Sequence, residues 1–167
     1  MEANYQILLV DYDNSIPAPF SNTMINGYRM KKAKDNAEAS SMARSSDVII
    51  LMASERKREC IKLMEHVRGA IDPTINFIVI LGGQQDNGFL DRIDKLTFQC
   101  FNKKNCKLVE LAKAIRNAIE MRALKIREKM FVQDLDRIEG ELIKVEHRLY
   151  TISTIKRIGN NDATFLN

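Results

Sequence analysis

Short apolar runs alternate with longer polar stretches along the first hundred residues of the chain. The three strongest runs are rich in Ile, Val and Leu and are bordered by Asp or Gly: 6–10 (QILLV), 48–52 (VIILM) and 77–81 (FIVIL). Runs of this kind are typical of strands buried on both faces of a parallel sheet. Weaker runs at 28–33 and 98–101 predict two more strands.

Helix-length stretches separate these runs, at 17–26, 36–45, 55–70 and 87–95, and a last one begins at Lys107. Strands and helices that alternate in this order favour right-handed crossovers between neighbouring parallel strands. The pattern therefore predicts an α/β fold, a doubly wound five-stranded parallel sheet of the flavodoxin type with an extended C-terminal α-helix.

The sequence after Lys107 has no Pro and no turn cluster before residue 159, which predicts one helix of about fifty residues. In its second part, apolar residues recur at alternating spacings of four and three, the a and d positions of a coiled coil. We call these residues the seam: Phe131, Leu135, Ile138, Leu142, Val145, Leu149 and Ile152. The alternative is a helix that folds back onto its own domain.

This pattern divides the chain into three parts. We predict a globular domain over residues 1–122, a coiled-coil helix over 123–158 that continues the last helix of the domain, and a flexible tail over 159–167.

The charges beside the seam bear on how two helices would pair. A parallel homodimer would place Asp134 near Glu139 and Glu141 near Glu146. An antiparallel pair would face Glu141 with Arg148 and keep a Glu139–Glu146 repulsion on each side. Exposed pairs contribute only about 0.2–1 kcal/mol each. The sequence therefore favours an antiparallel pair or a more basic partner helix, and it leaves the orientation open.

Composition narrows the classes of function. The 26 basic and 22 acidic residues are intermixed, and the densest basic patch, 56–58, lies between two glutamates, so we expect no nucleic-acid partner. No apolar stretch is long enough to span a membrane, and the start does not resemble a signal peptide. Three cysteines without a CxxC pair predict neither disulfides nor a metal site. We expect a cytoplasmic protein without metal or cofactor.

In an open parallel sheet, ligands bind beyond the carboxyl ends of the strands. The sequence places Asp11 and Tyr12 after the first run, Met52 at the end of 48–52, Gly82 after 77–81 and Lys103 after the fifth run. This order resembles the receiver domain of response regulators over about residues 4–122. ILLVDYD is similar to its opening strand and acidic corner, DVIIL to its third strand, and Lys103 to its lysine before the last helix.

The resemblance implies a phosphorylation site, and this sequence lacks most of its parts. The acceptor aspartate is replaced by Met52, and the second acid of the Mg²⁺ pair by Tyr12, with Asp13 displaced by one position. Gly82 stands where the family has a hydroxyl after the fourth strand, and Cys100 replaces the aromatic switch residue.

Asp11 and Lys103 are what remains of this set, and we interpret them as a structural ion pair. Ser54 could in principle serve as a replacement acceptor, but the sequence positions no base beside it. We therefore predict no catalytic residue and no enzyme activity. The interpretation is a pseudo-receiver, which keeps the fold without the phosphoryl chemistry.

The predicted function is phosphorylation-independent signalling or scaffolding through protein–protein contacts. The contacts would involve the receiver face at about residues 89–119 and the seam, with homodimerisation through the helix. Two alternatives stay open: the regulatory fragment of a larger two-component or cyclic-nucleotide signalling protein, and a small-molecule sensor that uses the strand-end crevice.

Overall fold

The computed structural model describes residues 5–12, 28–83 and 87–162, with side chains up to residue 156. The chain divides into two compact units, Met1–Lys125 and Ile126–Asn167. The elements follow in this order: β1 (Tyr5–Val10), β2 (Tyr28–Ala33), α2 (Asn36–Ala43), β3 (Val48–Ala53), α3 (Lys57–His66), the π-helical turn η1 (Val67–Ile71), β4 (Asn76–Leu81), α4 (Asn87–Asp94), β5 (Gln99–Asn102) and α5 (Leu108–Asp162). Helix α5 begins in the first unit, and its residues from 126 onward form the described part of the second.

The sheet of the first unit has five parallel strands in the order β2-β1-β3-β4-β5. This is the doubly wound arrangement that the sequence predicts, with the chain turning back after β2 and crossing over to β3. Each predicted strand is present, and its ends differ from the prediction by one residue at most. The fold class predicted from the sequence is confirmed.

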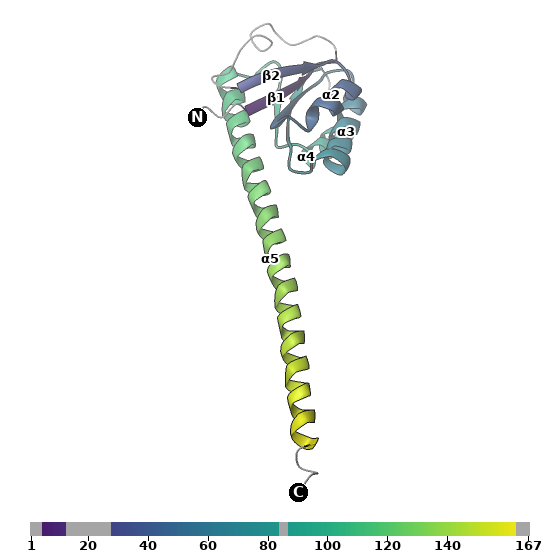
Figure 1. The fold of residues 1–167 in the computed structure, drawn as a ribbon. Helices are drawn as coiled ribbons and strands as arrows, with labels where there is room; N and C mark the ends of the chain where they lie inside the picture. The colour runs from purple at the N-terminus through teal and green to yellow at the C-terminus, as the bar shows by residue number, and fades with distance from the viewer. Residues whose placement is uncertain (1–4, 13–27, 84–86, 163–167) are drawn as a thin grey trace. The chain divides into compact units, whose positions relative to one another are not determined.

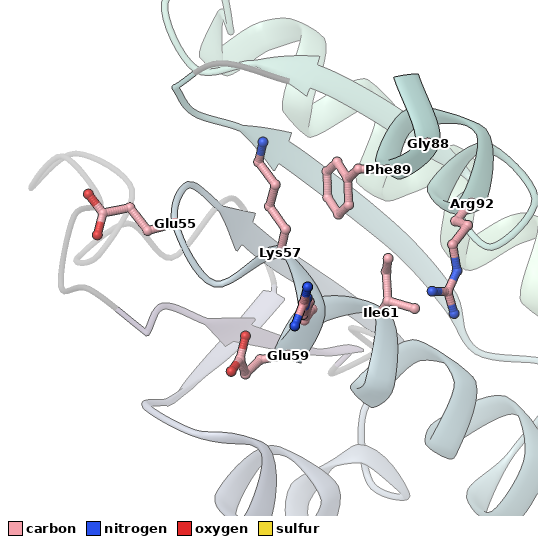
Figure 2. A pocket seen from close by; sticks show the side chains of 8 residues that line it. Glu55, Lys57, Glu59, Ile61, Gly88, Phe89 and Arg92 are labelled. Carbon is pink, nitrogen blue, oxygen red and sulfur yellow. The ribbon is translucent and has the colours of Figure 1, made fainter. Parts of the chain in front are cut away.

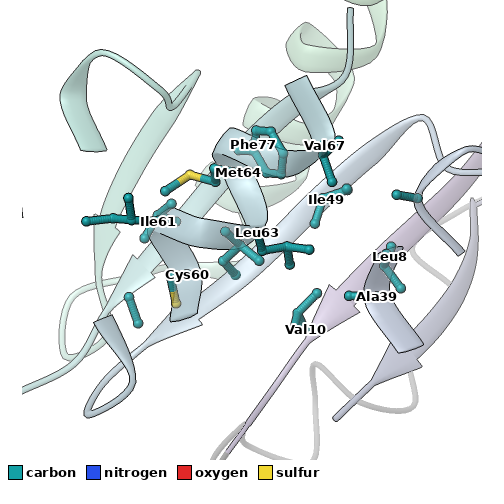
Figure 3. Packing of buried hydrophobic residues seen from close by; sticks show 14 of the residues in the cluster. Leu8, Val10, Ala39, Ile49, Cys60, Ile61, Leu63, Met64, Val67 and Phe77 are labelled. Carbon is teal, nitrogen blue, oxygen red and sulfur yellow. The ribbon is translucent and has the colours of Figure 1, made fainter. Parts of the chain in front are cut away.

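Helices α2, α3 and α4 lie on one side of the sheet (Figure 1). Side chains of the central strands alternate between an apolar layer on that side and a second layer on the opposite face. Leu8, Ile49 and Phe77 point to the layer formed with α2, α3 and α4, which Figure 3 shows from close by. Their neighbours along each strand point to the opposite layer, where Leu111 and Ile115 of α5 cover the sheet. Because both faces of the sheet are covered, the side chains on both sides of each central strand are apolar, and this explains the continuous apolar runs in the sequence.

Helix α2 begins at a side-chain cap. Asp35 has an extended backbone, and its carboxylate accepts a 2.8 Å hydrogen bond from the amide of Glu38. The carboxylate of Glu38 in turn accepts one from the amide of Lys34 at 3.0 Å. These bonds satisfy amides that have no partner inside the helix, so they fix where the helix starts after β2.

Some predictions fall at or beyond the limits of the described residues. The helix predicted at 17–26 and the displaced acid Asp13 lie outside them. Helix α5 continues to Asp162, past the end predicted at 158, and residues 163–167 of the predicted tail lie outside the description. Within the described segments, no helix combines the length and apolarity needed to cross a membrane.

Candidate functional site

The carboxyl ends of the parallel strands carry the residues that the sequence singled out. Asp11 follows β1, Met52 lies near the end of β3, Gly82 follows β4 and Lys103 follows β5. Neighbouring strands are in register here, with Met52 opposite Ile80. Residues far apart in the sequence therefore reach the same edge of the sheet, as expected for parallel strands.

Asp11 is buried at the end of β1 and has a cation beside it. Its side chain is fully covered, and its Oδ2 lies 3.4 Å from Nζ of Lys32, which comes from the neighbouring strand β2. The amide of Asp11 also donates to the carbonyl of Ala33 at 3.0 Å. A buried carboxylate needs a compensating charge, and the chain supplies one here from its own side chain. The predicted ion pair between Asp11 and Lys103 stays a prediction.

Tyr12 follows β1 and is held by contacts with α2 and α3. Its hydroxyl donates a 2.6 Å hydrogen bond to Oδ1 of Asn36, and its ring packs against the apolar layer of α2 to α4. The amide group of Asn36 donates to the carbonyl of Glu59 at 3.1 Å. Burial raises the pKa of Tyr12 far above its usual range, and the neighbouring thiol of Cys60 raises it further. Tyr12 therefore ties β1 to two helices as a neutral phenol.

Met52, which the sequence resemblance matches to the receiver acceptor, is 3% exposed. Its side chain belongs to the apolar layer under α5. Its carbonyl oxygen lies 3.8 Å from the thiol of Cys60 on α3, within the distance of a weak S–H hydrogen bond. A thioether cannot take up a phosphoryl group in the way a carboxylate does, so this position contributes packing to the sheet.

Gly82 lies in close contact with the ends of two other strands. Its amide donates to the carbonyl of Ala53 at 3.1 Å. A Cβ atom added at Gly82 would lie 3.2 Å from Cβ of Ser54 and 3.7 Å from Cδ of Lys103. The first distance is shorter than an ordinary contact between carbon atoms. The hydroxyl side chain that the receiver pattern has here would therefore require Ser54 to move.

A cavity of about 460 Å³ opens between the start of α3 and α4 (Figure 2). Its apolar wall includes Ile61 and Phe89, and Nζ of Lys57 lies 5.4 Å from the centre of the Phe89 ring. The charged side chains that line the cavity are of both signs. Lys57, Arg58 and Arg92 are basic, and Glu55 and Glu59 are acidic. In the sequence, 56–58 is only a basic patch between two glutamates, and the cavity that it forms with α4 is visible only in the fold.

The opposite edge of the sheet carries a polar cluster that the sequence analysis missed. Arg122 of α5 donates from Nη1 to Asp47 at 2.7 Å and from Nη2 to Asp72 at 2.9 Å. Asp47 also accepts from the amide of Gln6 at 2.8 Å. The carboxylate of Asp72 accepts from the hydroxyl and the amide of Thr74. These bonds fasten α5 to the loops that lead into β3 and β4.

Asn76, at the start of β4, adds a second attachment at this edge. Its side-chain amide donates to the carbonyl of Ala118 at 2.7 Å, and its oxygen accepts from Nζ of Lys125 at 2.8 Å. Burial lowers the pKa of Lys125, and the nearby charge of Arg68 lowers it further. No local pattern indicates these contacts, because the partners are more than forty positions apart.

All seven seam residues are exposed in the second unit. Their exposed fractions lie between 49% for Leu135 and Val145 and 65% for Phe131. A helix in water normally turns such a stripe toward another apolar surface. The described part of this unit consists of α5 alone, so the seam has no partner inside it.

The described residues offer little for metal or thiol chemistry. Among them, no three His, Cys, Asp or Glu side chains are grouped closely enough to hold a metal ion. Burial raises the pKa of the Cys100 thiol and of the Cys106 thiol. Both thiols are therefore kept in the protonated form, which is a poor nucleophile.

Comparisons with known proteins agree on the fold. No family model and no curated protein sequence matches the chain. The structure of an adenylate cyclase from Rhodopirellula baltica is similar with a TM-score of 0.66 and 19% identity, over 78% of this chain and 98% of that chain. A receiver domain from Clostridium thermocellum is similar with a TM-score of 0.58 and 22% identity, over 72% of this chain and 98% of that chain.

A third similar structure is the signal receiver domain of an HD domain-containing protein from Pseudomonas fluorescens. It has a TM-score of 0.62 and 21% identity, over 72% of this chain and 98% of that chain. The resemblance to receiver domains found in the sequence is confirmed at the level of the fold. The chain has the receiver fold of response regulators, and a long helix continues from its last element.

Proposed function

We propose that this chain is a signalling or scaffold protein of the response-regulator type that works without phosphorylation and without enzyme activity. It would act through protein contacts, using the receiver face at about residues 89–119 and the seam, and it would form a homodimer through the C-terminal helix. The observation that carries this proposal is the burial in an apolar layer of Met52, the residue that the sequence resemblance matches to the acceptor aspartate.

The surroundings of Met52 support the same proposal. Tyr12 offers a neutral phenol bonded to Asn36, where a second acid would be needed to bind Mg²⁺. Asp11 already has Lys32 beside it. Gly82 has no hydroxyl, and a Cβ atom added there would lie 3.2 Å from Cβ of Ser54. Three different strand ends thus depart from the requirements of phosphoryl transfer, each for a different physical reason.

Treatment with acetyl phosphate and Mg²⁺, followed by intact-mass spectrometry, tests the missing phosphoryl chemistry. We expect no mass increase under conditions in which a receiver with its acceptor aspartate, treated in parallel, is labelled. A Mg²⁺-dependent gain of one phosphoryl group would contradict the proposal, and mapping the modified residue would then identify the acceptor.

Light scattering on the full chain tests the homodimer. We expect a dimer for the wild type and a monomer for Leu142→Glu, because Leu142 lies in the middle of the seam. Ile143→Glu is the matched control, since Ile143 is 59% exposed against 56% for Leu142 but lies at an outward position of the heptad. A wild-type monomer, or equal loss of the dimer in both variants, would contradict assembly through the seam.

A second candidate is that the chain is the regulatory part of a larger signalling protein. Two of the similar structures are those of an adenylate cyclase and of the signal receiver domain of an HD domain-containing protein. In this case, the long helix would connect the receiver fold to a further domain. The mass of the native protein, measured by immunoblot from its source, tests this candidate, since a mass well above 19.2 kDa would favour it.

A further inference from the structure

We propose that the partner of the seam is a second copy of the same helix running in the opposite direction. This inference rests on the proposed homodimer and adds its orientation. It follows from the charges beside the exposed seam, because these charges treat the two orientations differently.

The apolar layers do not distinguish the two orientations. In a parallel pair, each seam residue meets its own copy. In an antiparallel pair centred between residues 143 and 144, Leu142 meets Val145, Ile138 meets Leu149 and Leu135 meets Ile152. Every layer from 135 to 152 is apolar in both arrangements, as knobs-into-holes packing requires. The choice therefore depends on the polar positions.

Glu128 adds an obstacle to the parallel arrangement. It lies seven residues before Leu135, at the a position directly preceding Phe131, and it is exposed in the second unit. A parallel in-register dimer would place the two Glu128 carboxylates against each other inside the interface. Two like charges held together at such a site repel each other, and this repulsion weakens the parallel pair. In the antiparallel pair, Glu128 lies beyond the last apolar layer.

The flanking positions favour the same orientation. A parallel pair brings Asp134 to Glu139 and Glu141 to Glu146, and each contact occurs twice in the dimer. All four contacts are repulsive. An antiparallel pair faces Glu141 with Arg148 twice, and the repulsion between Glu139 and Glu146 also occurs twice. Attraction and repulsion then balance, whereas the parallel pair contains repulsion alone.

Distances between spin labels in the full-length dimer distinguish the orientations. The background protein carries Cys100→Ser and Cys106→Ser, and it retains the buried Cys60. A single cysteine is then introduced as Lys129→Cys or Lys144→Cys, both at exposed outward positions of the helix. The background without an added cysteine measures any label taken up by Cys60.

The antiparallel pair predicts a long distance for one site and a short one for the other. Labels at 129 would lie 29 helical residues apart along the axis, or about 43 Å at a rise of about 1.5 Å per residue. Labels at 144 would be close together, because packed helix axes are about 8–10 Å apart. The parallel pair predicts short distances at both sites.

A short distance at 129 in a protein that light scattering shows to be a dimer would overturn the antiparallel orientation and leave the proposed homodimer intact. A wild-type monomer would overturn both. A dimer with a label distance above about 30 Å at residue 129 and a short distance at residue 144 supports the proposal. The threshold of about 30 Å also holds if the two helices are shifted along each other by half a heptad.

Discussion

Arg122 Nη1 lies 2.7 Å from Asp47 Oδ1, although the two residues are 75 positions apart in the sequence. The guanidinium also reaches Asp72 at 2.9 Å, so one side chain of α5 joins the loops before β3 and β4. The Arg122 side chain is 13% exposed, against 29% for Asp47 and 24% for Asp72. Bonds of this kind hold the first part of α5 on the sheet, where its apolar residues complete the second core layer.

Replacing Arg122 by Ala should lower the free energy of unfolding by about 1–3 kcal/mol, because two partly buried carboxylates lose their cation. Arg137→Ala is the control, since its ion pair with Asp134 is 3.5 Å long and largely exposed and should contribute little. Urea denaturation followed by circular dichroism measures both. Equal losses in the two variants would show that the Arg122 contacts add no stability of their own.

The same cluster predicts a dependence of stability on pH. Burial by itself raises the pKa of Asp72, but hydrogen bonds from Thr74 and the bonds and charge of Arg122 outweigh it, so the pKa is lowered. Asp72 therefore stabilises the fold above the pKa of an unfolded aspartate, about 3.9, and this contribution is lost as the pH falls through the lower folded value.

Asp72→Asn tests this relationship in denaturation curves taken between pH 7 and pH 2. The variant should be less stable than the wild type by a constant amount above about pH 5, and the difference should shrink below about pH 4. A difference in stability that stays constant from pH 7 to pH 2 would mean that the contribution of Asp72 does not depend on the ionisation of its carboxyl group.

Introducing a carboxylate by Met52→Asp should destabilise the fold and leave it unphosphorylated. Met52 is buried in the apolar layer under α5, so a carboxylate there would lose its hydration without gaining a partner of opposite charge from that layer. We expect a loss of more than about 2 kcal/mol. Met52→Leu keeps the volume and the apolar character and should lose less than about 1.5 kcal/mol.

Chemical denaturation and intact mass after acetyl phosphate treatment measure the two effects of Met52→Asp. A stable Met52→Asp variant that takes up a phosphoryl group would mean that the crevice keeps a working metal site despite Tyr12.

Gly82→Ala should destabilise the protein by about 1–3 kcal/mol, because the new methyl group would lie 3.2 Å from Cβ of Ser54. The double variant Gly82→Ala with Ser54→Gly should recover much of this loss, since the closest remaining atom, Cα of Ser54, is 3.6 Å away. Ser54→Gly alone is the reference for the double variant. Thermal unfolding of the four proteins measures the coupling, and additive effects would argue against a direct contact.

Local patterns in the sequence were sufficient to predict the sheet and the long helix. The strands are buried on both faces, so their apolar runs are continuous and their ends are easy to locate, as at 48–53. The seam is equally visible, because heptad spacing depends only on neighbouring turns of one helix. Met52 and Gly82 were singled out by the resemblance to receiver domains, since each is a single residue at or next to a strand end.

Tertiary structure decided how those residues are accommodated. Three contacts follow from the lateral order of the strands and from the packing of α2 and α3. They join Lys32 to Asp11, Tyr12 to Asn36, and Ser54 to Gly82. The Arg122 cluster has no signature in the sequence at all. Ion pairs and polar contacts depend on distances of a few ångströms between residues far apart in the chain. Apolar burial, in contrast, leaves a pattern along the sequence itself, either a continuous run or a regular spacing.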